Sequence, residues 1–228
     1  EPLPGNQENN GSGTTENSEV KLKATIGGIS RNYAITARTE AVATLSTYSS
    51  WAVVGEELSQ NGTTLSGGGT TADPYQIGSA PELALFAYLV NQGNKEICAM
   101  VTDNLDMFGG IYNTNTTVSP GNALQWIPMA DYQGTFDGGG HSLTNLKLES
   151  AGEVGLIGSL GNQGIVKNIG VDTASISATA NNAGAIVGHV TGANCQIIGC
   201  WNRADIRGRG NLGGVVGGCE GGGLLLEG

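Results

Sequence analysis

A short apolar string bounded by glycines recurs at a fixed interval in the C-terminal half of the chain. Residues 155–158 read GLIG, residues 184–188 read GAIVG and residues 213–217 read GGVVG, so that the leading glycines stand 29 residues apart. Strings this short, ended by glycine, fit strands that turn a corner, because glycine adopts the positive φ angles that corners need. A recurrence of this kind indicates a solenoid.

A second motif alternates with the first. Residues 143–148 (LTNLKL) resemble residues 166–171 (VKNIGV) at an offset of 23, and residues 197–202 (IIGCWN) form a third copy 31 residues later. We therefore expect Leu143, Val166 and Ile197 to stack in one internal row, and Asn145 and Asn168 to share a corner row. The same offsets place Leu146, Ile169 and Cys200 in a second internal row.

The composition fits a narrow core. The chain holds 39 glycines, of which 23 fall between residues 134 and 223, whereas aromatic residues make up only 5%. Such a chain fills thin layers that stack closely. No long amphipathic segment interrupts the repeats. The sequence therefore predicts an all-β fold, a right-handed parallel β-helix of about three coils.

Three regions follow from the pattern along the chain. Residues 1–18 are polar and contain no basic residue, which is typical of a disordered tether. Residues 19–66 are predicted to form a small β-rich segment, with strands at 19–26, at 33–48 and after Trp51. Residues 67–228 are expected to hold a capping helix and the β-helix.

One helix is predicted, from Ser79 to about Gln92. Ser79 and Glu82 form an S-x-x-E capping box, and Pro81 lies in the first turn. Leu83, Phe86, Ala87 and Val90 follow at helical spacing. A helix directly before a solenoid favours a cap, because open solenoid ends expose strand edges and apolar layers.

The repeat region resembles GLUG-motif repeat surface proteins of the Bacteroidetes type, a group of adhesins. The likeness is carried by residues 132–148 (YQGTFDGGGHSLTNLKL), by the three glycine-bounded strings and by the lead-in at residues 68–77. It covers about residues 67–220. The resemblance implies a right-handed parallel β-helix on an exported bacterial protein and supplies no catalytic motif. Residues 19–58 resemble the opening of fimbrillin-like surface proteins.

Charge and hydropathy narrow the partners. The formal net charge is −10 and basic residues are few, so a nucleic-acid partner is not expected. No run of about 18 apolar residues occurs, so we expect no membrane-spanning segment. A polar tether is what remains when a secretion signal or lipid anchor is removed. We therefore expect an exported protein that is secreted or lies at the cell surface or outer membrane, where it could be lipid-anchored.

The sequence gives little support for chemistry. Within residues 154–218 the only acids are Asp172 and Asp205, although four acids near the first coil could converge: Asp103, Asp106, Asp131 and Asp137. Glycan cleavage needs paired carboxylates. Asp137, before three glycines, is better explained as a turn residue that caps backbone amides. We expect no enzyme, with a glycan-active β-helix enzyme as the alternative.

No cofactor or metal is expected either. His141 and His189 lack ligand spacing, and the cysteines form no CxxC pair. Buried free thiols are the favoured interpretation, with a disulfide between neighbouring coils as the minority option.

Two groups of residues are candidate ligand contacts. Trp126 and Tyr132 lie near the first coil, and the only basic cluster, Arg203, Arg207 and Arg209, follows Trp201. An acidic glycan could bind there, or the cluster could be an ordinary solvated face. The expected function is a non-catalytic adhesin or scaffold that binds an extracellular glycan or host protein. A structural piece of a fimbria-like assembly is a further alternative, and the open C-terminal end could pair with another molecule.

Overall fold

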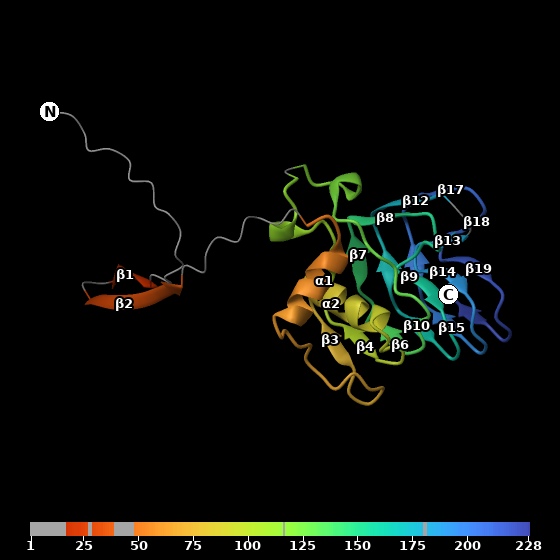
Figure 1. Cartoon of the computed structure of the whole chain (residues 1–228), viewed down its shortest axis with the longest axis horizontal. Helices are drawn as coiled ribbons and strands as arrows, with labels where there is room; N and C mark the ends of the chain where they lie inside the picture. The colour runs from red at the N-terminus through yellow and green to blue at the C-terminus, as the bar shows by residue number, and fades with distance from the viewer. Residues whose placement is uncertain (1–16, 27–28, 39–47, 116, 180–181) are drawn as a thin grey trace, which may run out of the picture. The chain divides into compact units, whose positions relative to one another are not determined.

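The computed structural model describes residues 17–26, 29–38, 48–115, 117–179 and 182–228. The chain divides into two compact units, Glu1–Ser46 and Thr47–Gly228. In the first unit β1 (Asn17–Ile26) and β2 (Ile29–Arg38) form an antiparallel hairpin (Figure 1). The strand predicted at 19–26 is thus present, whereas most of the predicted tether and the end of the second predicted strand lie outside the described residues.

The second unit is a parallel β-helix, as predicted. All its strand ladders are parallel. Its strands are β3 (Tyr75–Ile77), β4 (Ala99–Val101), β5 (Leu105–Asp106), β6 (Thr135–Asp137), β7 (Ser142–Thr144), β8 (Leu146–Ser150), β9 (Ile157–Leu160), β10 (Ile165–Lys167), β11 (Gly170–Val171), β12 (Ala174–Ala178), β13 (Asn182–Gly184), β14 (Val187–Val190), β15 (Gln196–Ile198), β16 (Trp201–Asn202), β17 (Ile206–Gly208), β18 (Asn211–Gly213), β19 (Val216–Cys219) and β20 (Leu225–Glu227).

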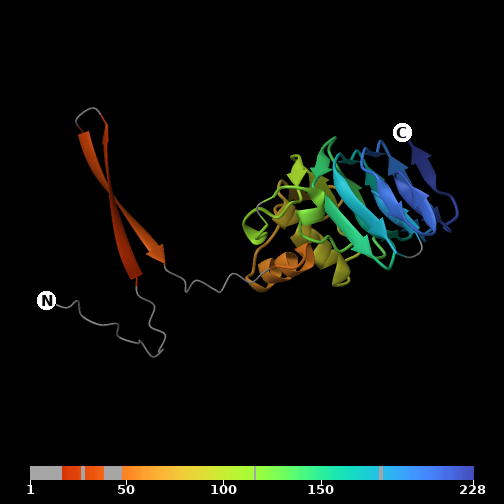
Figure 2. The same cartoon turned by 90° about the horizontal axis from the view of Figure 1, so that it is seen from above.

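These strands stack into five sheets, one on each side of the coil. The sheet orders are β20-β15-β10-β6-β4-β3, β16-β11-β7-β5, β17-β12-β8, β13-β18 and β19-β14-β9. Three successive coils follow from this order: residues 135–164, residues 165–195 and residues 196–224, after which β20 begins the next layer. Figure 2 shows their strands lying side by side along the stack.

The core is a set of internal rows that run through the coils. Phe136, Val166 and Ile197 are in register and fully buried, and Leu226 continues their row. The glycine-bounded strings also stack as predicted, since Gly184 pairs with Gly213. Each row places one apolar side chain in each layer, which fills a narrow core without large residues.

The structure corrects part of the predicted register. Leu143 pairs with Val171, not with Val166, so the row predicted for Leu143, Val166 and Ile197 holds only for the last two. Leu146 likewise pairs with Ala174 instead of joining the row of Ile169 and Cys200. The 23-residue offset had matched two different corners of the coil.

Those two corners have the same local structure, which explains the error. Asn145 and Asn168 both adopt positive φ, 55° and 54°, each between two short strands. Each side-chain amide donates to an aspartate of the preceding layer. Asn145 Nδ2 lies 2.9 Å from Asp106 Oδ1, and Asn168 Nδ2 lies 3.1 Å from Asp137 Oδ1. The corner role of the asparagines is confirmed, but they occupy separate rows.

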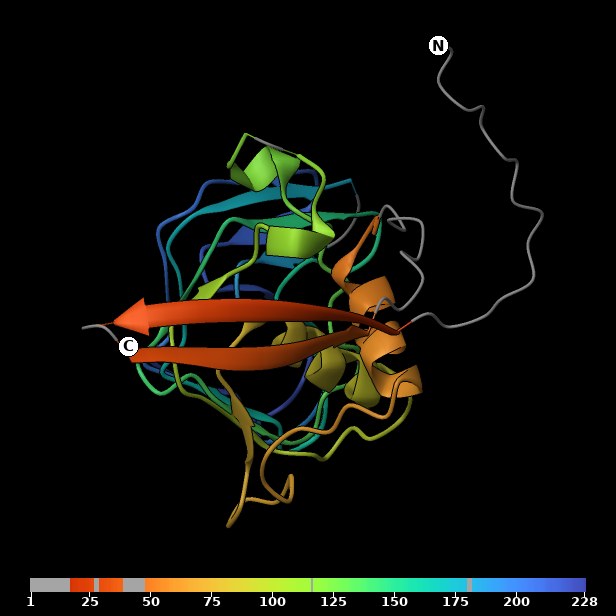
Figure 3. The ribbon, with the colours of Figure 1, turned by 90° about the vertical axis from the view of Figure 1, so that its left-hand side faces the viewer.

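The predicted helix is confirmed as α2 (Ala80–Asn91). The Ser79 hydroxyl accepts a hydrogen bond from the Glu82 amide, as expected of a capping box, whereas the Glu82 carboxylate accepts from the Ser79 hydroxyl and from the amide of Gly78. Phe86 projects from α2 onto the first layers, with its ring centroid 6.1 Å from Tyr132 and 6.0 Å from Phe136. Seen along the stack in Figure 3, α2 lies across the end of the coils.

A second helix, α1 (Trp51–Gln60), occupies the segment after Trp51, where the sequence predicted a strand. It packs against α2, where a side chain on Gly55 would lie 2.3 Å from the carbonyl oxygen of Ala84. Residues 47–66 therefore belong with the β-helix and not with the N-terminal segment. Neither described helix is long and apolar enough to span a bilayer.

Candidate functional site

A polar groove of about 450 Å³ runs along the outside of β12. Its floor is the strand segment 174–177, with the side chains of Ser175 and Ser177 between those of the buried row. One wall is the short 3₁₀ turn η2 (Pro120–Asn122), and the other carries Asp205 and Arg207. The groove thus combines hydroxyl, carboxylate and guanidinium groups on one rigid face.

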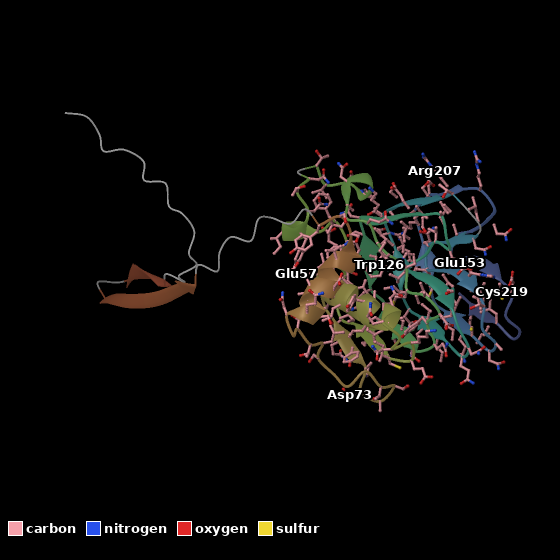
Figure 4. The ribbon with its side chains drawn as sticks, in the orientation of Figure 1. Glu57, Asp73, Trp126, Glu153, Arg207 and Cys219 are labelled. Carbon is pink, nitrogen blue, oxygen red and sulfur yellow. The ribbon has the colours of Figure 1, made fainter. Side chains whose placement is uncertain are left out.

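The sheet register explains why these side chains meet. Ser177 pairs with Arg207 in the following coil and with Glu149 in the preceding one, so the three side chains form a stripe across the coils. Alternate residues of a strand face opposite sides, which sends Ile176 into the core between the two serines. Figure 4 shows Arg207 at the outer edge of the coils. The stripe follows from strand pairing and not from loop conformation.

Charge along this stripe is mixed. Lys147 Nζ lies 3.7 Å from Glu149 Oε2, whereas Arg207 and Arg209 form no ion pair within the described residues. Arg207 lines the groove, and Arg209 lies outside it although both are exposed. Of the three arginines in the predicted basic cluster, Arg207 is therefore the one that lines the groove.

Trp201 and Arg203 form a cluster of their own. The Arg203 guanidinium carbon lies 5.0 Å from the centre of the Trp201 ring, and its Nη1 lies 3.1 Å from Asp172 Oδ1. Trp201 is 37% exposed. Because the cation already has both an aromatic and a carboxylate partner, this cluster links the second coil to the third and offers less to a ligand than Arg207 does.

Trp126 and Tyr132 are core residues, which corrects their assignment as ligand contacts. Trp126 is 1% exposed and its indole N–H donates to the Leu156 carbonyl at 3.0 Å. Tyr132 is fully buried, its hydroxyl donates to the Ile97 carbonyl at 2.8 Å, and burial raises its pKa well above the usual value.

The acids near the first coil do not converge. Asp131 is paired with Lys95, Asp137 is paired with Lys167 at 3.0 Å, and Asp106 accepts hydrogen bonds from Phe108 N and Asn145. Asp137 also accepts from the Gly139 amide at 3.0 Å, which confirms the predicted turn. In the part of the chain that the structure describes, no three His, Cys, Asp or Glu side chains gather as metal ligands would.

His189 joins three coils, a contact that the sequence did not reveal. Its Nδ1 lies 2.7 Å from Glu153 Oε1 and its Nε2 lies 3.8 Å from Glu220 Oε1. The ring is nearly buried beside Ser159 and Gly218, its register partners. Both acids lie outside the strands of the repeat, so strand periodicity gave no signal for them.

Most of the residues that line the groove were not predicted from the sequence. Ser175, Ser177 and the η2 turn carry no motif, and they meet only because η2 folds back beside β8 and β12. Arg207 was predicted from its place in the basic cluster. Asp205 was noted only as an isolated acid.

Fold and groove together define the class as a parallel β-helix with an outward-facing polar groove. Among known proteins, 100 residues of the chain are 31% identical to part of halomucin from Haloquadratum walsbyi. The match spans 43% of this chain and about 1% of the length of that relative. No family model matches the chain, and no solved structure matches it.

Proposed function

We propose that this protein is a non-catalytic surface protein that binds an extracellular glycan in the groove beside β12. The observation that carries the proposal is the lining of that groove, in which Arg207, Asp205 and two serines face outward from a rigid sheet. Sugar hydroxyls both donate and accept hydrogen bonds. A guanidinium, a carboxylate and hydroxyls side by side complement them, and charge-assisted bonds are the stronger ones.

Rigidity favours binding. The floor of the groove is held by ladder hydrogen bonds to the strands on both sides, because β12 pairs with β8 and with β17. A ligand that lies across the coils therefore orders little of the protein when it binds, and the entropic cost of association falls.

The carboxylates support binding over cleavage. Glycoside hydrolysis uses two carboxyl groups that flank the scissile bond. The groove lining contains one, Asp205. The alternative of a glycan-active enzyme therefore needs a second carboxylate that this groove does not supply from its lining residues.

Export is part of the same proposal. The resemblance to GLUG-motif surface proteins favours a protein outside the cell, at the cell surface or outer membrane or secreted. The partial match to halomucin agrees with this part of the proposal. A host-protein ligand would engage a wider area than the groove.

A glycan array tests the proposal. The chain is expected to bind a defined set of glycans, and the double variant Asp205→Asn, Arg207→Ala is expected to lose those signals. Bound glycans are then incubated with the chain and their reducing ends are counted. No array signal would remove the binding proposal, and new reducing ends would replace it with the enzymatic alternative.

A further inference from the structure

A cavity of about 420 Å³ opens between the start of α2 and the loop that follows β5. It shares no lining residue with the groove beside β12. Its walls include the apolar side chains of Trp51, Leu105 and Tyr112, and of the described residues that line it Asp106 alone is charged. A mostly apolar cavity with a few polar groups is the usual form of a binding site.

Ile111 lines this cavity and yet is 85% exposed. It lies in the 3₁₀ turn η1 (Gly110–Tyr112), on a loop that is closed by a neighbouring side chain. The Asn113 amide donates to the Phe108 carbonyl at 2.6 Å and to the Asn122 carbonyl at 2.8 Å. A single exposed apolar side chain is ordinary, but one that borders an apolar cavity extends the surface that a partner can bury.

The aromatic wall of the cavity is fixed by its own packing. The centroid of the Tyr112 ring lies 5.1 Å from that of Tyr48 and 6.2 Å from that of Trp51, edge to face with both. The indole N–H of Trp51 donates to the Met107 carbonyl at 3.0 Å. Because these rings are already ordered, a ligand that packs on them loses little conformational entropy of the protein.

Asp106 keeps one carboxylate oxygen for a ligand. Its Oδ1 accepts from the Phe108 amide at 3.0 Å and from Asn145 Nδ2 at 2.9 Å. Its Oδ2 has no hydrogen-bond partner among the described residues, and the side chain is exposed. The protein therefore holds the carboxylate by one oxygen, and the other can accept a charge-assisted hydrogen bond from a cation.

The start of α2 lies at the same cavity, since Ser79 lines it. A helix N-terminus attracts anions, but here Glu82 of the same helix occupies that position. Its carboxylate accepts from the Ser79 hydroxyl and from the Gly78 amide, both at 2.9 Å. With Asp106 as the charged lining residue, the cavity favours a cation, and the net charge of −10 acts in the same direction.

We propose that this cavity binds a basic side chain, Lys or Arg, from an exposed peptide segment of a partner protein. The aliphatic part of that side chain packs on Leu105 and Tyr112, and its charged end reaches Asp106. An apolar residue next to it in the partner covers Ile111, which a free amine would leave in water. Glycan binding in the groove beside β12 is not required for this contact.

Selection from a phage-displayed library of random linear peptides tests the proposal on the whole chain. Enriched peptides are expected to share a Lys or Arg beside an apolar residue. In calorimetric titrations with those peptides, Ile111→Ser should weaken binding about tenfold, because burial of an apolar side chain is lost. Val118→Ser is the matched control and should leave the affinity unchanged, since Val118 is also exposed between β5 and β6 but does not line the cavity.

Salt distinguishes a charge contact from a structural role of Asp106. Asp106→Asn should weaken peptide binding about fivefold at about 0.05 M sodium chloride and much less at about 0.5 M, because salt screens exposed charges. A loss that is the same at both salt concentrations overturns the charge contact.

Three further results would overturn the proposal. The first is that no peptide is enriched, or that enriched peptides lack a basic residue. The second is equal affinity for Ile111→Ser and Val118→Ser. The third is a glycan-array signal that Ile111→Ser abolishes and the Asp205→Asn, Arg207→Ala variant keeps, since the cavity would then bind a sugar. Array signals that Ile111→Ser keeps and the double variant loses leave the proposed function standing, whatever peptides are enriched.

Discussion

The indole ring of Trp201 fills the space that a side chain on Gly170 would need. The two residues are register partners on neighbouring coils, and a Cβ atom on Gly170 would lie 2.1 Å from Cε2 of the ring. The flat contact lets the ring lie against the surface of the second coil. Gly170 has no positive φ, so its backbone conformation does not require glycine. Glycine is required here because a side chain would have no space.

Gly170→Ala should therefore displace Trp201. Overpacking of this kind costs about 1–3 kcal/mol of unfolding free energy. Because Trp51 and Trp126 are buried, a change in fluorescence on substitution reports mainly on Trp201. Gly222→Ala is the control, since a Cβ there meets nothing within 4 Å. Equal urea midpoints and equal spectra for the two variants would show that the contact is absent.

Among these substitutions, truncation of Phe86 in the capping helix α2 is expected to lower the free energy of unfolding most. Phe86 is fully buried between the helix and the first layers. Phe86→Ala should cost about 3–5 kcal/mol, because it leaves a cavity where the end of the coils was sealed. Val53→Ala on α1 removes an apolar side chain that is 40% exposed and should cost far less. Similar losses of unfolding free energy for both would contradict the capping role of α2.

The free energy of unfolding should depend on pH through the carboxyl group of Asp137. Burial alone would raise its pKa, but hydrogen bonds from Gly139, Lys167 and Asn168 together outweigh burial and lower it. A lowered folded pKa stabilises the fold above the unfolded value of about 4, and that stability is lost as pH falls through the folded pKa.

Asp137→Asn should therefore cost about 1.5–3 kcal/mol near pH 7, as expected for a hydrogen-bonded charge. The difference from the wild-type chain should shrink as the pH falls below about 4, where the carboxyl of the unfolded chain is protonated first, and it should be lost below the lowered pKa of the folded chain. Urea unfolding at both pH values checks this. A constant difference across the range would mean that the substitution acts through shape and not through charge.

The four cysteines should differ in reactivity. All are free in the structure: Cys98 and Cys195 are buried, Cys200 is half-buried and Cys219 is exposed. Burial is the main cause that raises the pKa of the Cys200 and Cys195 thiols, which further slows their reaction. Ellman's reagent should find one fast thiol in the folded chain and four in urea. Two fewer in urea would indicate the disulfide between coils that the sequence left open.

The repeat pattern predicted the fold because layers of a solenoid impose the same demand on each coil. The 29-residue spacing of Gly155, Gly184 and Gly213 identified layers that the structure confirms in register for Gly184 and Gly213. The capping box at Ser79 and Glu82 predicted α2 for an equally local reason. Both signals can be seen in the order of residues along the chain.

The rest depends on contacts between distant parts of the chain. Helix α1 contains two valines and a glycine and has no side-chain hydrogen bond at its cap, so it depends on packing, with Trp51 and Val54 buried and Gly55 close to Ala84. Trp126 lies outside the repeat, and periodicity could not show that it is buried. The groove needed both the strand register and the position of η2, neither of which a single sequence reveals.

Arg207 is the residue through which the groove beside β12 is proposed to bind a glycan. Isothermal titration of a glycan selected on the array, with the Arg207→Ala and Arg209→Ala variants, tests it most directly. Both arginines are exposed on the last coil, but only Arg207 lines the groove. Loss of a charge-assisted hydrogen bond, worth about 1.5–3 kcal/mol, should weaken binding by Arg207→Ala about 10- to 100-fold and leave Arg209→Ala unchanged. Equal affinities for the two variants would rule out binding through Arg207.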